Sequence, residues 1–483
     1  MSIFRSTDPT TWDDVDGIIV NESAPAPNVR GVAANIGILV GQSERGPSSL
    51  EEPGGIAGFH ELYGRNSSFG MNISLKNKKF GRLKFIRVVA SNAVVASVTF
   101  DDGEIAPEDV VTFRAKQGAG AYGNNIEVKI EAGSVEGKKY TVRDTNPNTV
   151  MQTEVFDNVT MANIVQALAG SKLVTVEVVD ADLVPANQDF TPLESGSDGT
   201  VADTDYQAAI AKAAVEKAGN VIFLDAYNST RNGYLRTHVA ETQDKMCILA
   251  GPESQDVSAV IADVANNRDV DGRIIYAYPW VETVINGVRT FTSPASWYAS
   301  IITQTAPNID PAFVENARFL AGVTGLKTYL TRNQFIQLKD AGVSAFERDE
   351  DIGFKIKSGI VTQISNSSKV TVLRRRMTDY LTNSAANFLK NYQNAVNSAQ
   401  NRNFVKGALL TFIEGQEAVG LLPRDSEVAG GAAKLVDVVS DNSDATIAAG
   451  FFRIIWRQRL FSSMRFIVLS AEIGESVVVT EAG

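Results

Sequence analysis

Few residues in this sequence carry side chains suited to nucleophilic or metal chemistry. Its 483 residues include one cysteine, Cys247, and two histidines, His60 and His238. A single cysteine excludes an intrachain disulfide framework and a cysteine-based zinc site. Cys247 lies in an apolar run typical of a buried strand, and His238 shares a helical face with Leu235 and Val239. We therefore predict no catalytic site, no metal site and no cofactor.

One segment matches the dinucleotide-binding pattern G-x-G-x-x-G, with glycines at Gly118, Gly120 and Gly123. That pattern binds pyrophosphate where a strand precedes it and a helix follows it, because the helix N-terminus meets the phosphates. Here the following residues, Asn125 to Ile130, alternate between polar and apolar side chains as a strand does. We interpret the glycines as a loop between strands.

The basic residues offer two candidate contact sites. Arg374, Arg375 and Arg376 are the densest basic run, and three consecutive helical positions point to different faces, so the pattern predicts a solvated start to a helix. Arg402 and Lys406 are four residues apart, on one helical face, and could meet an acidic partner. The alternative for this second pair is an ordinary solvated face.

The composition is that of an ordinary globular protein, with 44% hydrophobic and 21% charged residues. The length corresponds to about three domains. No apolar run approaches the ~20 residues that span a membrane, and the first residues lack the apolar core of a signal peptide. We expect a soluble protein, made and kept in the cytosol. The net charge of −11 argues against a nucleic-acid groove.

Hydrophobic periodicity indicates the elements that must position these residues. Continuous apolar runs alternate with helical segments, which is typical of a parallel α/β sheet buried on both faces. The predicted strands are Ile36–Val40, Leu83–Ala90, Val221–Leu224, Met246–Ala250 and Arg273–Ala277. The predicted helices lie near Gly58–Tyr63, over Asp205–Ala218 with Thr204 as cap, near Tyr234–Thr242, near Val257–Val264, and from Ser293-Pro294 onward.

Two further regions have different patterns of apolar and turn-forming residues. Residues 91 to 199 contain short β-rich runs separated by Gly, Asp and Asn, with one helix near Met161–Ala169, and so predict a β-rich insertion. From residue 366 onward, apolar stripes predict two long helices, followed by apolar strands near Phe451–Trp456 and Met464–Leu469.

Both ends of the chain carry short strand-prone segments. The first 30 residues are polar and turn-rich apart from the apolar run Gly17–Val20, and the prolines Pro25 and Pro27 follow it. We interpret this region as a mobile tail carrying one short strand; a frayed terminus without a role is the alternative. Beyond Gly474 the chain ends in ESVVVTEAG, again strand-prone.

Several segments, in order along the chain, resemble contractile phage tail sheath proteins, the family shared with R-type pyocins and related injection machines. The matching segments are GVAANIGILVGQSERGP (31–47), GRLKFIRVVA (81–90), AYGNNIEVKI (121–130), LESGSDGT (193–200), IIYAYPW (274–280) with the SPAS helix start, and MRFIVLSAEIGE (464–475). The sequence departs from the family in its polar lead, residues 1 to 14, and in a longer β insertion.

The resemblance implies an α/β and α+β multidomain fold. The domains would be an N-terminal arm and linker (1–30), a parallel α/β domain with a non-catalytic subtilisin-like fold (31–90 plus 200–365), a β-rich insertion domain (91–199), an inner α+β domain close to the tail tube (366–472) and a C-terminal arm (473–483).

The resemblance also implies which residues make contacts between subunits. The arms would add strands to sheets of neighbouring subunits. The arm strands would comprise Gly17, Ile18, Ile19, Val20, Asn21 and Glu22 at one end, and Glu475, Ser476, Val477, Val478, Val479 and Thr480 at the other. The receiving sheet would include Phe451, Ile454, Trp456, Phe466 and Val468. Arg402 and Lys406 become the candidates for contacts to the tube.

The function implied is structural rather than enzymatic. The chain would polymerise around a tail tube as a helical homo-oligomer of stacked hexameric rings, and contraction would drive the tube through the host envelope. Its partners would be other copies, the tube protein, and baseplate and terminator proteins, with no nucleic acid and no membrane. It would reside in the virion after assembly in the host bacterial cytoplasm. The alternatives are another tail or virion component, such as tube or baseplate, or a soluble α/β enzyme.

Overall fold

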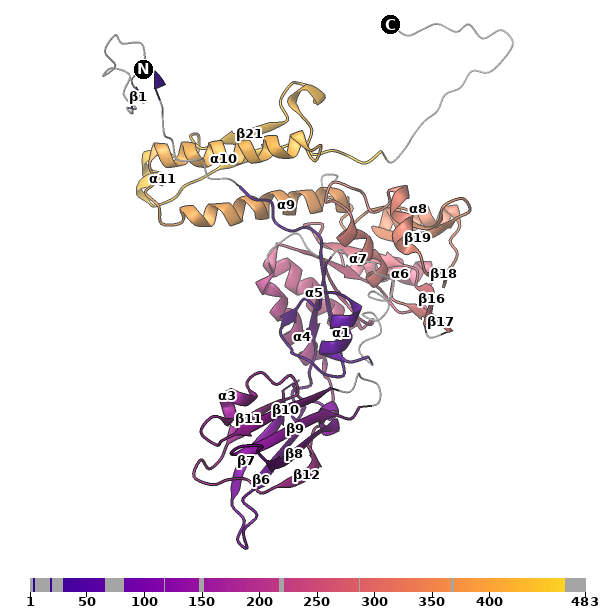
Figure 1. Ribbon diagram of the computed structural model, residues 1–483. Helices are drawn as coiled ribbons and strands as arrows, with labels where there is room; N and C mark the ends of the chain where they lie inside the picture. The colour runs from indigo at the N-terminus through magenta and orange to yellow at the C-terminus, as the bar shows by residue number, and fades with distance from the viewer. Residues whose placement is uncertain are drawn as a thin grey trace. The chain divides into compact units, whose positions relative to one another are not determined.

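The computed structural model describes residues 3–4, 18–19, 29–65, 82–116, 118–146, 152–216, 221–285, 287–365 and 369–464 (Figure 1). The chain divides into two compact units. The first comprises Met1–Val32 and Leu381–Phe461, and the second comprises Ala33–Tyr380 and Ser462–Gly483. Several sheets and many helices alternate along the chain, so the predicted mixed α/β multidomain architecture is confirmed.

The second unit is built on an eight-stranded sheet of order β20-β19-β15-β14-β13-β3-β5-β4. Its six central strands run parallel, and the two edge strands β4 and β20 pair antiparallel with their neighbours. The strands are β3 (Ile36–Gly41), β4 (Leu50–Glu51), β5 (Arg82–Arg87), β13 (Val221–Leu224), β14 (Met246–Leu249), β15 (Ile274–Tyr278), β19 (Val343–Asp349) and β20 (Gly353–Ile356). The parallel sheet predicted from the continuous apolar runs is confirmed.

Helices cover both faces of this sheet, which explains why its strands are apolar on both sides. One apolar core joins the sheet to α1 (Ile56–Tyr63) and α7 (Pro294–Gln304). The other core joins it to four helices. These are α4 (Asp203–Ala211), α5 (Ser229–Thr242), α6 (Val257–Asn266) and α8 (Arg332–Ala341).

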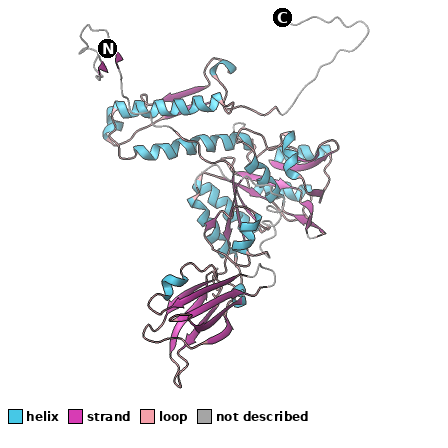
Figure 2. Ribbon diagram, in the orientation of Figure 1, coloured by secondary structure: helices cyan, strands magenta, loops and turns pink. Residues whose placement is uncertain are grey.

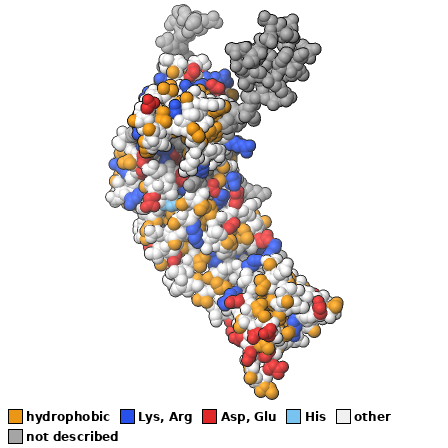
Figure 3. Space-filling model, turned by 90° about the vertical axis from the view of Figure 1, so that its left-hand side faces the viewer, with side chains coloured by type: hydrophobic (Ala, Val, Ile, Leu, Met, Phe, Trp, Pro, Cys, Tyr) orange, Lys and Arg blue, Asp and Glu red, His pale blue; other side chains and the backbone are white. Residues whose placement is uncertain are grey.

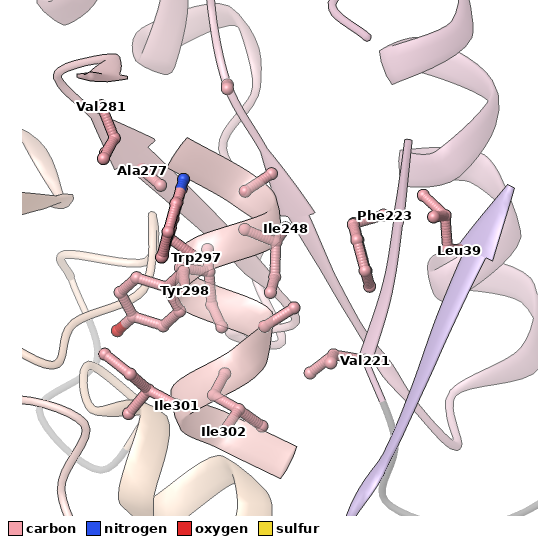
Figure 4. Packing of buried hydrophobic residues seen from close by; sticks show 14 of the residues in the cluster. Leu39, Val221, Phe223, Ile248, Ala277, Val281, Trp297, Tyr298, Ile301 and Ile302 are labelled. Atoms are coloured by element: carbon pink, nitrogen blue, oxygen red, sulfur yellow. The ribbon is translucent and has the colours of Figure 1, made fainter. Parts of the chain in front are cut away.

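Helix α7 begins as the sequence predicts, because the Ser293 hydroxyl accepts the Ala295 N–H and Pro294 occupies the first turn. Almost the whole helix is buried. Figure 4 shows Trp297 and Ile301 of this helix in the apolar core that also contains Ile248 of the sheet.

Helix α4 begins earlier than predicted. It starts at Asp203 rather than Asp205, because the Asp205 carboxylate accepts the N–H of Ala202, one turn before, and so closes the first turn. Thr204 is therefore inside the helix and does not cap it. The helix ends at Ala211 and continues as the 3-10 turn η3 (Lys212–Val215).

The β-rich insertion is a sandwich of two antiparallel sheets, β10-β9-β8-β12 and β11-β7-β6, around its own apolar core (Figure 2). Its elements are β6 (Ser97–Asp101), β7 (Asp109–Ala115), β8 (Ile126–Ala132), β9 (Lys138–Asp144), β10 (Thr153–Val159), α3 (Ile164–Leu168), β11 (Val174–Val178) and β12 (Gln188–Pro192). The glycine-rich segment forms the 3-10 turn η2 (Ala121–Asn125) and leads directly into β8. The glycines thus lie between β7 and β8, and the interpretation as a loop between strands is correct.

The insertion leaves and rejoins the α/β sheet at adjacent points. The Val94 N–H donates to the Ser197 carbonyl at 2.9 Å, and the Ser197 N–H donates to the Val94 carbonyl at 3.0 Å. A buried cluster adds to this junction: the Arg45 guanidinium, from the loop after β3, contacts the Asp144 carboxylate of β9 at 3.2 Å and the Tyr122 hydroxyl. The two chain crossings thus form one paired neck.

The far end of the insertion is acidic. The turn between β6 and β7 exposes Asp101, Glu104, Glu108 and Asp109 around the fully exposed Ile105. Figure 3 shows acidic side chains gathered at this end of the insertion. Such a surface repels phosphate backbones.

The remaining elements complete the two units. A small antiparallel sheet, β17-β16-β18, joins β16 (Val281–Ile285), β17 (Val288–Thr292) and β18 (Val323–Leu326), with the 3-10 turn η4 (Val314–Leu320). Then follow α9 (Val372–Leu389), η5 (Lys390–Tyr392), α10 (Ala399–Ala418), η6 (Asp425–Glu427), β21 (Lys434–Asp437), α11 (Asp444–Ala448) and β22 (Ile455–Gln458). No helix among the described residues is long and apolar enough to cross a membrane.

The arginine triplet at the start of α9 does not form the solvated surface that its spacing predicts. Arg376 is 1% exposed, and its guanidinium donates to the carbonyls of Ile302, Thr305, Ala306 and Ala34. The first three belong to the C-terminal end of α7 and the residues after it, where helical carbonyls have no partner in the helix. Burial lowers the pKa of Arg376 to about 10, which leaves it charged at neutral pH.

Replacement of Arg376 by leucine should lower the free energy of unfolding by about 3 kcal/mol or more, because buried carbonyls lose their donor. The matched control is Arg374→Leu, since Arg374 is half-buried and its guanidinium donates to the Ser462 hydroxyl; it should cost less than about 1 kcal/mol. Urea unfolding followed by circular dichroism measures both. Equal losses in the two variants would contradict this account.

Candidate assembly interface

The first unit carries a two-stranded antiparallel ribbon. Strands β21 and β22 pair with Lys434 opposite Gln458 and Val436 opposite Trp456. Between them, the Ser443 hydroxyl accepts the Thr446 N–H and begins the short helix α11. Two strands alone are marginal in water, so such a ribbon needs a further surface to pack on.

Helix α10 provides that surface. Its buried residues recur at helical spacing and comprise Val405, Ala408, Leu409, Phe412, Ile413 and Glu417. The Lys434 ammonium of β21 donates to both carboxylate oxygens of Glu417, at 2.7 and 2.9 Å. Glu417 is 8% exposed, and its hydrogen bond raises the pKa of Lys434. This charged contact fixes the ribbon on the helix.

Neither β21 nor β22 has a further strand beside it in the described part of the chain, and the outer edge of β22 is the one that contains the predicted receiving residue Trp456. The Arg459 N–H donates to the Ala433 carbonyl at 2.8 Å, so Arg459 directs its backbone groups toward the β21 side. Backbone groups alternate along a strand, so those of Trp456 and Gln458 point to the opposite edge. The Trp456 Nε1 and the Gln458 Oε1 are also buried without a hydrogen-bond partner among the described residues. An added strand could pair with this edge.

The predicted receiving residues fall only partly on this ribbon. Trp456 lies in β22, Ile454 directly precedes it, and Phe451 is 58% exposed. The strand predicted near Phe451–Trp456 is present but begins later in the chain and spans Ile455–Gln458. Before Ile455, the backbone N–H and carbonyl of Arg453 bind the side chain of Asn442 instead of a partner strand. Strand β21 was not predicted, and Phe466 and Val468 lie outside the described residues.

The predicted arm strands are described only in part. Ile18 and Ile19 form the short strand β2, which pairs in parallel with β1 (Ile3–Phe4) of the same chain. The polar lead was not predicted to contain a strand. The other predicted arm residues, Gly17, Val20–Glu22 and Glu475–Thr480, lie outside the described part of the chain, and the role of both arms between subunits stays a prediction.

The two candidate tube contacts lie on α10 and are half-buried. The Arg402 guanidinium donates to the carbonyl and the side-chain oxygen of Asn397, at 3.1 and 2.9 Å. Lys406 lies near Asp437, whose pKa is lowered mainly by the Ser440 hydroxyl and in smaller part by Lys406. Neither observation tests a contact to another protein.

Of the three residues best suited to catalysis, Cys247 and His238 are buried in structural positions, and His60 is half-buried in α1. Cys247 lies in β14 and is fully buried, and burial raises the pKa of its thiol. His238 is 7% exposed, and burial, with Lys245 nearby, lowers its pKa to about 4, so it is neutral at pH 7. No group of three or more His, Cys, Asp or Glu side chains in the described residues could hold a metal ion.

A polar cavity of about 520 Å³ lies at the carboxyl ends of β3, β5 and β13, where ligands bind in many α/β proteins. Its charged groups are already engaged. Asp225 accepts the Gln42 N–H and the Tyr206 hydroxyl, each at 3.3 Å, and burial raises the pKa of Asp225 to about 6. The Arg87 guanidinium donates to the carbonyls of Gly46 and Ala119. The sequence pattern did not identify this cavity, since its residues come from distant segments.

Replacement of Lys434 by methionine should loosen the ribbon, because it leaves the buried Glu417 carboxylate without its cation. Amide hydrogen exchange in β21 and β22 should accelerate by about tenfold, while exchange in the α/β sheet stays unchanged. Lys390→Met is the matched control, because Lys390 is exposed and its ammonium donates to the Asn387 side chain rather than to a buried carboxylate. Unchanged exchange in the ribbon would show that the contact does not hold it.

Comparison with known proteins gives a match by structure but not by sequence. No protein-family model and no curated protein matches the sequence. Among solved structures, a sheath tail protein from Listeria innocua matches with a TM-score of 0.63 and 14% identity, over 86% of this chain and 90% of that one. A sheath tail protein from Desulfitobacterium hafniense matches with a TM-score of 0.56 and 17% identity, over 87% and 93% of the two chains.

The helical sheath of the anti-feeding prophage in its contracted state also matches, with a TM-score of 0.58 and 13% identity, over 95% of this chain and 99% of that one. The three superpositions therefore cover between 86 and 95% of this chain. The resemblance seen in the sequence is confirmed at the level of structure. This chain has the fold of contractile tail sheath proteins.

Proposed function

We propose that this protein is the structural subunit of a contractile tail sheath. The observation that carries the proposal is the match over almost the full length to a helical sheath in its contracted state. The subunits would polymerise around a tail tube as stacked hexameric rings, bind baseplate and terminator proteins at the ends, and drive the tube through the host envelope on contraction. Assembly would take place in the host cytoplasm, and the product would be part of a virion.

The role is structural rather than enzymatic. The α/β domain would correspond to the subtilisin-like domain of the family, without a protease site. The buried, neutral His238 and the buried Cys247 support this assignment, because neither side chain is accessible to a substrate. The charged groups of the polar cavity also support this assignment, because Asp225 and Arg87 are already hydrogen-bonded within the protein.

Strand exchange would link the subunits. An arm of about five residues that adds to a sheet edge forms roughly four to six hydrogen bonds, each worth about 1 kcal/mol net. Two arms per subunit, held near their receivers by the polymer, gain from effective concentrations around millimolar. The outer edge of β22 supports this proposal, since no strand of the described residues pairs with it and the ribbon is fixed to α10.

Contraction would release energy stored in the assembly, so no nucleotide is needed. The extended lattice would be metastable, held by the tube and baseplate, and the contracted lattice would bury more surface between subunits. Roughly 500 Å² of additional apolar burial per subunit corresponds to about 12 kcal/mol before the opposing costs. A small net surplus, summed over many subunits, is sufficient to move the tube.

Purified full-length protein should form wide hollow sleeves in electron micrographs, and deletion of residues 1–22 should abolish them while the monomer remains folded. Ile18→Pro with Ile19→Pro should act like the deletion, because proline cannot donate to a sheet. Ala26→Pro, between two existing prolines of the linker, is the matched control. Normal sleeves from the deletion variant would count against the arms, and monodisperse globules from the full-length chain would favour an enzyme.

We propose that Arg402 and Lys406 contact the tube. Weak polar contacts suit this interface, because the sheath must dissociate from the tube on contraction. Arg402→Glu with Lys406→Glu should reduce co-sedimentation with assembled tubes by about tenfold and leave sleeves without tubes unaffected. Lys390→Glu serves as control on an exposed site of the same unit. Undiminished binding of the double variant to tubes would remove these residues from the interface.

A further inference from the structure

Three exposed arginines lie in or next to strand β22 of the ribbon. Arg457 lies in β22, Arg459 directly follows it, and Arg453 precedes it by two residues. They are four and two residues apart, and this even spacing places their side chains on one face where the chain is extended. None of the three forms an ion pair with a carboxylate among the described residues. The Arg459 guanidinium donates to the Ala429 carbonyl at 3.2 Å, which leaves its charge without a counter-charge, so the row is a local positive site on a chain whose net charge is −11.

The backbone shows that this row is continuous with the strand. The Arg453 N–H donates to the Asn442 side-chain oxygen at 2.9 Å, and the Arg453 carbonyl accepts from the Asn442 amide at 2.6 Å. At the other end, the Arg459 N–H donates to the Ala433 carbonyl. Both arginines thus direct backbone groups to the paired side of β22, and the intervening even-numbered residues direct theirs to the free edge.

The C-terminal sequence carries a complementary charge pattern. Glu475 and Glu481 bracket the strand-prone segment Ser476–Thr480, and no lysine or arginine occurs after residue 465. The two glutamates are six residues apart, which is also the separation of Arg453 and Arg459. In an antiparallel register Glu475 lies opposite Arg459 and Glu481 opposite Arg453; in a parallel register the pairs are exchanged. In either strand direction, each of the two glutamates lies opposite one of the two arginines.

We propose that Arg453 and Arg459 select the C-terminal segment of a second copy, by pairing with its Glu475 and Glu481 as the segment adds to the free edge of β22. The proposal rests on the sheath function proposed above and adds the residues that set partner and register. Opposite charges directly across a strand pair stabilise it, whereas like charges oppose it. A slip of one residue would turn the glutamates to the other face, so the charges fix the register.

The N-terminal segment has the same acidic spacing, with Asp16 and Glu22 on either side of Gly17–Asn21. Ile18 and Ile19 already pair with Ile3 and Phe4 of their own chain. The C-terminal segment is therefore the occupant that we assign to β22, and the N-terminal segment is the competitor in the test.

Charge reversal in the full-length protein tests the assignment. Arg453→Glu with Arg459→Glu should raise the concentration needed for sleeve assembly by about tenfold, and addition of Glu475→Arg with Glu481→Arg should restore assembly. Arg424→Glu, an exposed arginine outside the row, should change nothing. Sedimentation and electron microscopy measure assembly, and circular dichroism verifies the fold of each variant. Assembly of wild-type protein should also weaken with added salt.

The outcomes separate this inference from the proposed function. If the wild-type protein forms no sleeves, the sheath function itself fails. If it forms sleeves and the arginine double variant does so equally well, the function stands and the arginine row is unimportant. Rescue by Asp16→Arg with Glu22→Arg, and not by the C-terminal changes, would overturn the assignment and place the N-terminal segment on β22. Loss of assembly with no rescue by either pair would overturn the proposed charge pairing.

Discussion

The end of helix α7 imposes the central constraint on the α/β domain. This helix is almost wholly buried against the sheet, so its last carbonyls end away from water and need donors. Arg376 supplies several donors at once, and the same guanidinium reaches the Ala34 carbonyl just before β3. One cation thereby joins three segments that are distant in sequence: the approach to the first parallel strand, the end of α7 and the start of α9. A neutral side chain could not serve all of these acceptors together.

Much of this fold could be predicted from the sequence, because parallel strands buried on both faces leave a strong signal. The apolar run Val221–Leu224 and the Ser293-Pro294 helix start both appear as predicted. The prediction for the arginine triplet failed because it depended on contacts between residues distant in the sequence. The arginine triplet looked solvated, because no local pattern shows that distant carbonyls surround Arg376. The helix α4 starts at Asp203 because a carboxylate inside it closes its own first turn.

The candidate interface was less visible in the sequence. Trp456 could be assigned to a receiving sheet, but β21 has only four residues, two of them charged, and no alternation long enough to mark it. The strand β22 starts later than predicted because the Asn442 side chain substitutes for a partner at Arg453. The arms were inferred from a family resemblance, and no spacing of residues alone could have shown whose sheet they join. The structure adds the free edge and its row of cations.

The paired neck of the β insertion has a consequence for how such proteins diverge. Because the chain departs and returns through two residues bonded to each other, Val94 and Ser197, the rest of the subunit meets the same two ends whatever lies between them. The insertion can therefore be lengthened, shortened or exchanged in evolution without a change in the sheet and helices to which it is attached. In the proposed sheath, the same property would make the neck a grafting point, where a foreign module would be displayed in many regularly spaced copies.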